Sequence, residues 1–199
     1  EMIFELRAGS NFDDDDQSML TGQNGEGAAL TNIFSSEFVV ETCDRKNKFK
    51  MVFEDNSQNR HEAVVTKVGS GVAGYTRVTY TPEFHRLGLR GIDNDNFMML
   101  QARTYQIAAT NPHLKVYFNG TQIKFKSFKD YIEMFVGDDY VFDDSEHWKV
   151  GIAGSDDGFK HISFVNGTHT KTGGTHINYV SNQVCDALRT HIKKKHKID

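Results

Sequence analysis

The residue types and spacing with the clearest chemical potential lie in one short stretch, Gly22 to Ser35, which reads GQNGEGAALTNIFS. Three glycines, Gly22, Gly25 and Gly27, fall close together in front of a helix-competent apolar run. Glycine allows a positive φ and a close approach of the backbone to a ligand. A helix that begins behind it offers free N–H groups and the positive end of the helix dipole. The stretch is therefore a candidate binding site for phosphate or another anion.

The spacing of these glycines, G-x-x-G-x-G, differs from both common phosphate motifs. It is neither the dinucleotide-binding G-x-G-x-x-G nor the P-loop G-x-x-x-x-G-K-[ST], and no lysine follows the last glycine. In a chain with 17 glycines, such a trio on its own is more often an ordinary loop than a phosphate site. The motif therefore needs support from its neighbours in the chain.

The composition is that of a folded protein without a membrane span. The chain has 199 residues, of which 38% are hydrophobic and 25% charged, so it is long enough for one large or two small domains with a packed core. No apolar run approaches about 18 residues, so no membrane partner is expected. Cys43 and Cys185 are too few for a disulfide scaffold and fit a reducing environment. The first residue is Glu1 rather than Met, and we therefore expect a fragment or a processed product.

The charge is distributed unevenly, although the net charge is only −4. Acidic residues collect at 13–16 and 138–146, and basic residues at 193–197. The run Asp13 to Asp16 is more typical of a solvated loop than of a cation site. The lysines near the end of the chain suit the C-terminus of a helix.

Hydrophobic periodicity predicts an α+β protein. Within the first helix, Leu30, Ile33 and Phe34 are expected to lie on one face. An Asn119-Gly120 turn between alternating residues predicts a hairpin over 115–125. The expected strands are 38–42, 48–54, 63–68, 76–81 and a pair formed by 148–153 with 161–166; the expected helices are 28–35, 93–109, 128–135 and 176–195.

The order of several segments resembles a known family. GSNFDDDD, TGQNGEGAALTNIFS, YTRVTYTP and ISFVNGTHTKTGGTHI, followed by a lysine-rich helix, are similar to the ATPase subunit of type IIA DNA topoisomerases, which includes gyrase B and eukaryotic topoisomerase II. The ending IKKKHKID looks most like the large subunit of T4-type bacteriophage topoisomerases. The resemblance covers nearly the whole chain.

This resemblance implies an architecture and a set of partners. Residues 1–137 resemble the later part of a GHKL ATPase α/β sandwich, and residues 138–199 the start of a transducer domain similar to ribosomal protein S5 domain 2. In the family, ATP closes two ATPase domains into a dimer gate that captures DNA. The expected partners are therefore DNA, a second copy of the chain as a homodimer, and the DNA-cleaving subunit or domain. The expected location is cytoplasmic, in the host cell if the protein is phage-encoded.

The resemblance also assigns residues to a site. Thr76 matches a strand threonine that helps to bind adenine, although an ordinary strand residue explains it as well. Gly9, Ser10 and Asn11 match a segment that reaches ribose and phosphate. The phosphate-binding lid, whose backbone amides wrap the triphosphate, matches Gly22, Gln23, Asn24, Gly25, Glu26, Gly27, Ala28 and Ala29. Candidates for DNA contact are Lys193, Lys194, Lys195 and Lys197.

No catalytic residue and no metal ligand is assigned within the chain. The family places the glutamate general base, the asparagine that holds Mg²⁺ and an Asp-x-Gly-x-Gly segment before Glu1. It places a lysine that contacts the γ-phosphate, in a Gln-Thr-Lys loop, after Asp199. The parent protein is thus expected to be an ATP-hydrolysing DNA topoisomerase that uses ATP and Mg²⁺, and the chain alone to be inactive.

Two other functions fit parts of the sequence. The chain fits a non-catalytic module that dimerises or binds DNA through its lysine-rich helix, in which case DNA binding should depend strongly on salt. It also fits another GHKL ATPase, such as a mismatch-repair or chaperone relative. Those proteins should lack the segment FVNGTHTKTGGTHI, which ranks this alternative below the topoisomerase.

Overall fold

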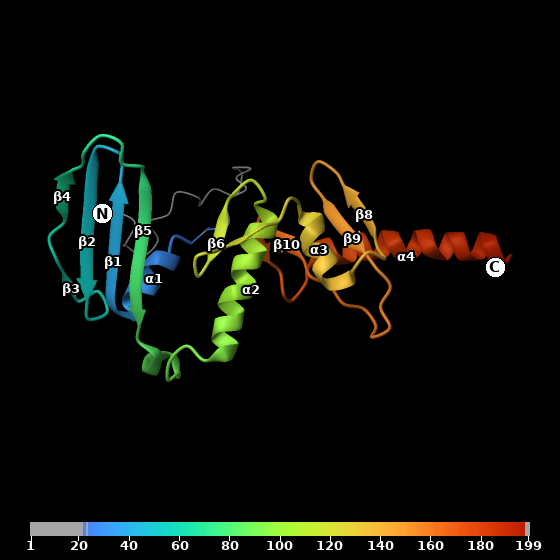
Figure 1. The fold of residues 1–199 in the computed structure, drawn as a ribbon. Helices are drawn as coiled ribbons and strands as arrows, with labels where there is room; N and C mark the ends of the chain where they lie inside the picture. Colours follow the sequence, from blue (N-terminus) through green and yellow to red (C-terminus); the bar gives the residue numbers. More distant parts are fainter. Residues whose placement is uncertain (1–21, 23, 198–199) are drawn as a thin grey trace. The chain divides into compact units, whose positions relative to one another are not determined.

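A computed structural model of the chain describes residue 22 and residues 24–197 and shows an α+β fold (Figure 1). The fold divides into two compact units, one ending at Asn94 and the other beginning at Asp95. This division differs from the predicted domain boundary at residue 137. The predicted boundary follows the family resemblance rather than compactness, and it stays a prediction.

The first unit is built on a five-stranded antiparallel sheet with the order β3-β2-β1-β5, in which β4 also pairs with β2. Figure 1 shows β2, β1 and β5 running side by side. The predicted strands of this unit are confirmed, with slightly different ends. The elements are α1 (Gly27–Ile33), β1 (Ser35–Cys43), β2 (Asn47–Glu54), β3 (Asn59–Arg60), β4 (Val64–Lys67), β5 (Tyr75–Pro82) and the 3-10 turn η2 (Phe84–Leu87).

The turn between β1 and β2 is closed by Asp44. Its Oδ1 accepts hydrogen bonds from the backbone N–H groups of Lys46 (2.8 Å) and Asn47 (2.6 Å). These bonds, led by the one from Asn47, hold the pKa of Asp44 below its ordinary value. An aspartate that bonds to the backbone two and three residues ahead is a common turn device, so the sequence itself directs the chain back at this point.

The core of the first unit lies on one face of its sheet. Phe38 and Val40 of β1 stand opposite Phe53 and Met51 of β2, and all four are buried. Because the side-chain period of a strand is two, these residues share one face. The β5 residues that register with Phe38 and Val40 are Tyr80 and Val78, and both remain about half-exposed.

On the other face of this sheet, polar side chains gather around Glu41. Glu41 accepts hydrogen bonds from Lys48 Nζ at 2.7 Å and from the Tyr75 hydroxyl at 2.6 Å, and Arg77 lies 3.6 Å away. The bond from Lys48, followed by that from Tyr75, lowers the pKa of Glu41. The same carboxylate raises the pKa of Tyr75. Glu41 is therefore paired with charged and polar partners from β2 and β5.

The second unit combines three helices with three two-stranded ribbons. The predicted Asn119-Gly120 hairpin is confirmed, and both turn residues have positive φ (47° and 77°), as a two-residue hairpin turn requires. The elements are α2 (Asn94–Thr110), β6 (Val116–Phe118), β7 (Thr121–Ile123), α3 (Phe128–Val136), β8 (Val141–Asp144), β9 (Lys149–Ile152), β10 (Phe164–Val165), β11 (Thr168–His169) and α4 (Thr175–His196).

One predicted strand pair in this unit is wrong. The segment 148–153 does not pair with 161–166; β9 pairs with β8, and β10 pairs with β11. Strand β8 was not predicted from the sequence. Its second half, Asp143-Asp144, belongs to an acidic run, and aspartate is depleted in strands. In the fold, Lys149 Nζ bonds Asp144 Oδ1 at 2.6 Å across the ribbon, so the acidic end is compensated by its neighbour.

Aromatic rings form the centre of the second unit. Tyr131 of α3 is buried and packs edge-to-face on Phe125 and Phe135, with ring centroids 5.9 and 5.1 Å away. Phe164 of β10 packs on the same ring from 5.9 Å. Helix α4, by contrast, has no buried residue within its described length. None of the helices in the described part of the chain is both long and apolar enough to cross a bilayer.

Candidate functional site

The glycine motif leads directly into α1, whose first residue is Gly27. Gly25 has a φ of 62°, a left-handed conformation that glycine adopts without strain. The first helical hydrogen bond runs from Leu30 N to Glu26 O at 2.9 Å. The backbone N–H groups of Gly27, Ala28 and Ala29 therefore have no partner among the i→i−4 hydrogen bonds of the helix and lie at its N-terminus. In the described part of the predicted lid, a bend at residues 24–25 is followed by the start of α1. The predicted helix after Gly27 is confirmed, and the ligand role of these residues stays a prediction.

Gly27 is not explained by the fold around it. Its φ is not positive, and a Cβ added to it would meet no heavy atom of the described chain within 4 Å. A glycine in a helix costs about 0.5–1 kcal/mol relative to alanine. Neither backbone conformation nor packing in the described residues requires glycine here. A ligand that approaches the backbone closely would require it.

Helix α1 buries one small and one polar residue. Ala29 and Asn32 are buried, whereas Leu30 is 43% exposed. The apolar residues Leu30, Ile33 and Phe34 are therefore not the ones that α1 buries. The small Ala29 side chain and the hydrogen-bonded Asn32 amide, which donates to Ser57 Oγ at 3.1 Å, allow the helix to pack closely on this side. Among the predicted phosphate ligands, Ala29 can contribute only its backbone N–H.

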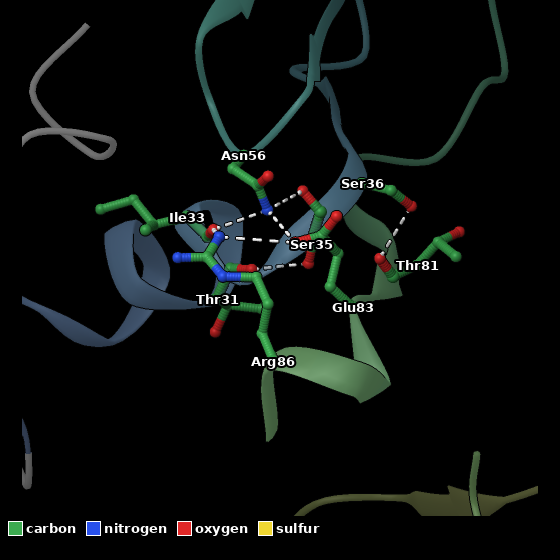
Figure 2. A network of polar contacts seen from close by, with 8 residues as sticks. All are labelled: Thr31, Ile33, Ser35, Ser36, Asn56, Thr81, Glu83 and Arg86. Atoms are coloured by element: carbon green, nitrogen blue, oxygen red, sulfur yellow. Dashed lines mark hydrogen bonds and ion pairs between the residues drawn. The ribbon is translucent and has the colours of Figure 1, made fainter. Parts of the chain in front are cut away.

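A group of polar side chains holds the other end of α1 (Figure 2). Asn56 Nδ2 and Arg86 Nη1 both donate to the carbonyl oxygen of Ile33, at 3.0 and 3.1 Å. Asn56 Nδ2 also lies 2.7 Å from Glu83 Oε2, and Arg86 Nη1 lies 3.4 Å from the same oxygen. The hydrogen bond from Asn56, supported by Arg86, holds the pKa of Glu83 below its ordinary value, while partial desolvation opposes the shift.

Sequence reasoning missed this polar group. Asn56, Glu83 and Arg86 come from a turn and from the segment after β5, far from α1 in the chain. Their residue types are ordinary for turns and surfaces. A weak signal was present in Asp55-Asn56-Ser57, a run of turn-forming residues after a strand, but it predicts a turn and not its partner.

The other predicted ATP-binding residues are only partly brought together. Gly9, Ser10, Asn11 and Gln23 lie outside the described residues. Thr76 is on β5 opposite Thr42, at the far end of β1 from α1. Two surface hollows of the first unit are lined by Ser36 and by residues within 82–85 and 88–93, and none of the predicted ligands lines them. The candidate site is therefore a strip of backbone at α1 with one strand residue at a distance.

The lysine cluster lies at the end of α4. Lys193, Lys194 and Lys195 occupy its last turn and are exposed, and Lys197 is the C-cap with a φ of 53°. Cations at this end of a helix are stabilised by its dipole. The structure therefore gives the cluster a helix-stabilising position that leaves its charges accessible to a partner.

The bend before α4 contains two glycines and a bonded histidine. Gly173 and Gly174 have φ values of 80° and 157°. His176 Nε2 lies 3.0 Å from Thr170 Oγ1 and 3.3 Å from Ser163 Oγ, so the imidazole is hydrogen-bonded within the bend. Within the described range, no three metal-ligating side chains come together.

Comparisons with known proteins agree with this geometry. The profile of the family described as DNA gyrase B matches residues 114–199. The chain is 35% identical to the DNA topoisomerase 2 of Candida glabrata over 99% of its own length and 16% of that protein. It is also 35% identical to the DNA topoisomerase 2 of Saccharomyces cerevisiae, over 99% of its length and 15% of that protein. The chain thus spans only a small part of the curated relatives it matches.

Solved structures give the same result for the fold. The ATPase region of Saccharomyces cerevisiae topoisomerase II bound to ICRF-187 superposes with a TM-score of 0.90 at 35% identity, covering 98% of this chain and 53% of that one. The ATPase and transducer domains of topoisomerase II from Balamuthia mandrillaris give 0.89 at 33% identity, covering 98% and 52%. These solved relatives are eukaryotic, and none of these matches identifies a phage-type protein. The chain is homologous to part of the ATPase region of type II DNA topoisomerases.

Proposed function

We propose that this chain forms the part of a type II DNA topoisomerase ATPase that holds the triphosphate of ATP. The observation that carries the proposal is Gly27. It stands at the start of α1 with open space at its missing side chain and without a positive φ. In a chain homologous to an ATPase region over 98% of its length, close approach of a phosphate supplies the reason for this glycine.

In this proposal the lid binds through its backbone. The N–H groups of residues 22–29 donate hydrogen bonds to phosphate oxygens, and charge-assisted bonds of this type are among the stronger ones in proteins. Glu26 contributes its N–H and directs its carboxylate away from the phosphate, because two negative groups in contact would be unfavourable. Gly9, Ser10 and Asn11 would reach ribose and phosphate, and Thr76 would lie near adenine.

The remaining chemistry of ATP hydrolysis would come from outside the chain. Bound Mg²⁺ neutralises charge on the phosphates, but the described residues contain no cluster that would hold it. The general base and the Mg²⁺ ligand are expected in other parts of the complete polypeptide. We expect the 199-residue chain by itself to lack Mg²⁺-dependent ATP turnover.

The partners follow from the same homology and are proposals for the complete protein. Two copies would close into a dimer gate when ATP binds, and the gate would capture a DNA segment for passage through a break made by a DNA-cleaving subunit or domain. The similarity of IKKKHKID to the phage enzymes supports a T4-type source, and with it a location in the host cytoplasm.

The end of α4 is the proposed DNA contact. Lys193, Lys194, Lys195 and Lys197 are exposed and close together in the chain, as a phosphate-binding surface requires. If all four bind phosphates, the slope of log K against log salt should become less steep by about 0.9 for each lysine that is removed. Titrating duplex DNA against the complete protein and its lysine-to-alanine variants, at several salt concentrations, measures this slope.

The lid is tested by a pair of glycine substitutions in the complete ATPase subunit. Gly27→Ala should raise the KM for ATP about tenfold to hundredfold, as expected for losing one or two hydrogen bonds to a charged group. Gly69→Ala is the matched control, because Gly69 also lacks a positive φ and has open space around its missing Cβ. Equal KM values for the two variants would contradict the proposal.

A further inference from the structure

We propose that Asn56 and Arg86 are positioning residues that clamp the C-terminal end of α1, so that the lid at its N-terminal end presents its N–H groups to ATP. We refer to Asn56, Glu83 and Arg86 as the α1 clamp. The inference rests on the proposed function, since it assigns the clamp an effect on ATP binding. None of these side chains needs to touch the nucleotide.

Helix α1 is short. It has only seven residues, and isolated helices shorter than about 12–15 residues are marginal in water. Its side chains bury little, since only Ala29 and Asn32 are fully enclosed. The direction of this helix must therefore come from contacts at its ends.

Two side-chain donors bind the carbonyl oxygen of Ile33. The last carbonyl groups of a helix lack intrahelical partners, and here the Ile33 oxygen receives one bond from Asn56 and one from Arg86 (Figure 2). The positive charge of Arg86 also suits the negative end of the helix dipole. The guanidinium lies over the ring of Phe34, 4.9 Å from its centroid. Arg86 thus fixes both the last turn of α1 and the residue that follows it.

The turn that carries Asn56 has an unusual backbone conformation. Asp55, Asn56 and Ser57 have φ values of 52°, 60° and 70°, and consecutive left-handed residues other than glycine are uncommon. Such a conformation persists only where the surrounding structure determines it strongly. Here Asp55 N donates to Ser36 O at 3.0 Å and Asn56 N to Ser35 O at 3.1 Å. The turn is therefore built against the junction of α1 and β1.

The α1 clamp is also connected to the end of β5 through Glu83. Glu83, just after β5, accepts from Asn56 and Arg86, and its own N–H donates to Phe34 O at 2.9 Å. Glu83 therefore holds the two donors in place while its backbone binds the end of α1. A helix of this length spans about 10 Å, so a tilt at the clamped end moves the lid directly. The clamp thus sets the position of the phosphate-binding strip.

The test uses variants that keep the fold of the turn. Asn56→Gly retains the positive φ and removes the amide; Arg86→Lys retains the charge and removes the planar donor group. In the complete ATPase subunit, Asn56→Gly should raise the KM for ATP about tenfold, equivalent to about 1.4 kcal/mol, with kcat changed much less. Arg86→Lys should raise KM by about threefold, because an ammonium replaces only part of the guanidinium contact.

Ser36→Ala is the matched control. The Ser36 hydroxyl lies beside the clamp but donates to Thr81 O at 3.3 Å, away from α1. This variant should leave KM within about twofold of the parent value. Amide hydrogen exchange of residues 30–34 without nucleotide gives a second readout, and it should be faster in Asn56→Gly than in Ser36→Ala.

The outcomes separate the clamp from the lid. A purely structural role would lower the fraction of active enzyme and leave KM unchanged, and that result for Asn56→Gly would overturn the clamp while Gly27→Ala still raises KM. If Gly27→Ala also leaves KM unchanged, the proposed function fails and the clamp fails with it. If Asn56→Gly does not fold, Arg86→Lys decides: a raised KM supports the clamp, and an unchanged KM overturns it.

Discussion

Helices α1 and α4 are held in opposite ways. Helix α1 has seven residues, two of them buried, and side chains from two other segments donate to its last carbonyl. Helix α4 has 22 residues, none of them buried in its described length. The short helix is defined by its surroundings, and the long helix by its own sequence. The candidate phosphate site lies on the helix that depends on distant residues.

The long helix illustrates what local sequence can specify. Its lysines lie in the last turn, where the dipole favours them, and the chain leaves it through a left-handed C-cap at Lys197. The apolar side chains along this helix are largely exposed to solvent, since Leu188 is 55% exposed and Ile192 is 50% exposed. Removing an apolar side chain should therefore have different consequences in the two units.

The largest expected difference is between Phe38→Ala and Leu188→Ala. Phe38 is 1% exposed in the core of the first unit, so its truncation should cost about 3–5 kcal/mol of unfolding free energy. Leu188→Ala should change stability by no more than about 0.5 kcal/mol. Labelling of the buried thiol of Cys43 in denaturant reports the first unit, and the fluorescence of Trp148 reports the second. Similar losses in the two variants would contradict this distinction.

A smaller difference is expected between two substitutions of Asn56. Asn56→Ala and Asn56→Gly remove the same amide, but alanine must also adopt a φ near 60°. The unfolding free energy of Asn56→Ala should therefore be about 1–2 kcal/mol lower than that of Asn56→Gly. Denaturant titration of Cys43 labelling in both variants measures the difference. Equal stabilities would show that the turn relaxes and that its conformation is not enforced.

A substitution to glycine at the end of α4 should increase stability, and its effect should be smaller than the difference at Asn56. Lys197 caps the helix with a φ of 53°, and no tertiary contact of the described chain is needed to explain it. Lys197→Gly should relieve strain and stabilise α4 by about 0.5–1 kcal/mol. Helix content followed by circular dichroism during thermal unfolding detects this. A loss of helix content would indicate that Lys197 makes an additional contact.

The smallest expected effects are on pH dependence, because the groups concerned are partly exposed. The pKa of Glu83 is lowered below 4.5, so its contribution is present above that pH and is lost as the pH falls through its folded pKa. Glu83→Gln should reduce the acid sensitivity of Cys43 labelling, whereas it should leave Trp148 fluorescence unaffected. If Glu83→Gln leaves the acid sensitivity of Cys43 labelling unchanged, Glu83 does not act in the α1 clamp.

At alkaline pH, the titration of Tyr140 affects the stability of the second unit. Desolvation, together with the bond to Glu133, raises the pKa of Tyr140 to about 12 from an ordinary value of 10.0. Its contribution is therefore fully present below pH 10.0 and is lost as the pH rises toward 12. Tyr140→Phe should reduce the pH dependence of stability in this range, as followed by Trp148 fluorescence. Because Tyr75 in the first unit is also shifted upward, the variant is needed to assign the effect.

Local patterns predicted most of the elements. The periodic stripe of α4, the alternation in β5 and the Asn119-Gly120 turn all correspond to elements in the fold. The strand β8 was missed because two aspartates obscure its pattern. The orientation of α1 was also missed, since Ala29 and Asn32 are buried by contacts with distant residues rather than by hydrophobic periodicity.

The candidate site was predictable only in part. The glycine spacing and the family resemblance predict the lid, and the helix start behind the glycines is confirmed. The phosphate-binding role of the lid stays a prediction. The α1 clamp was not predictable, since Asn56 and Arg86 contact Ile33 across 23 and 53 positions in the chain. Such contacts follow from strand pairing and turn conformation, and no local pattern encodes them.

The most direct measurement is amide hydrogen exchange in the complete ATPase subunit, with and without an ATP analogue that resists hydrolysis at its terminal phosphate. If the lid binds the triphosphate through its backbone, the analogue should slow exchange at residues 24–29 and leave residues 184–192 of α4 unchanged. Binding of the analogue without any change at residues 24–29 would contradict the proposal that this strip holds the phosphates.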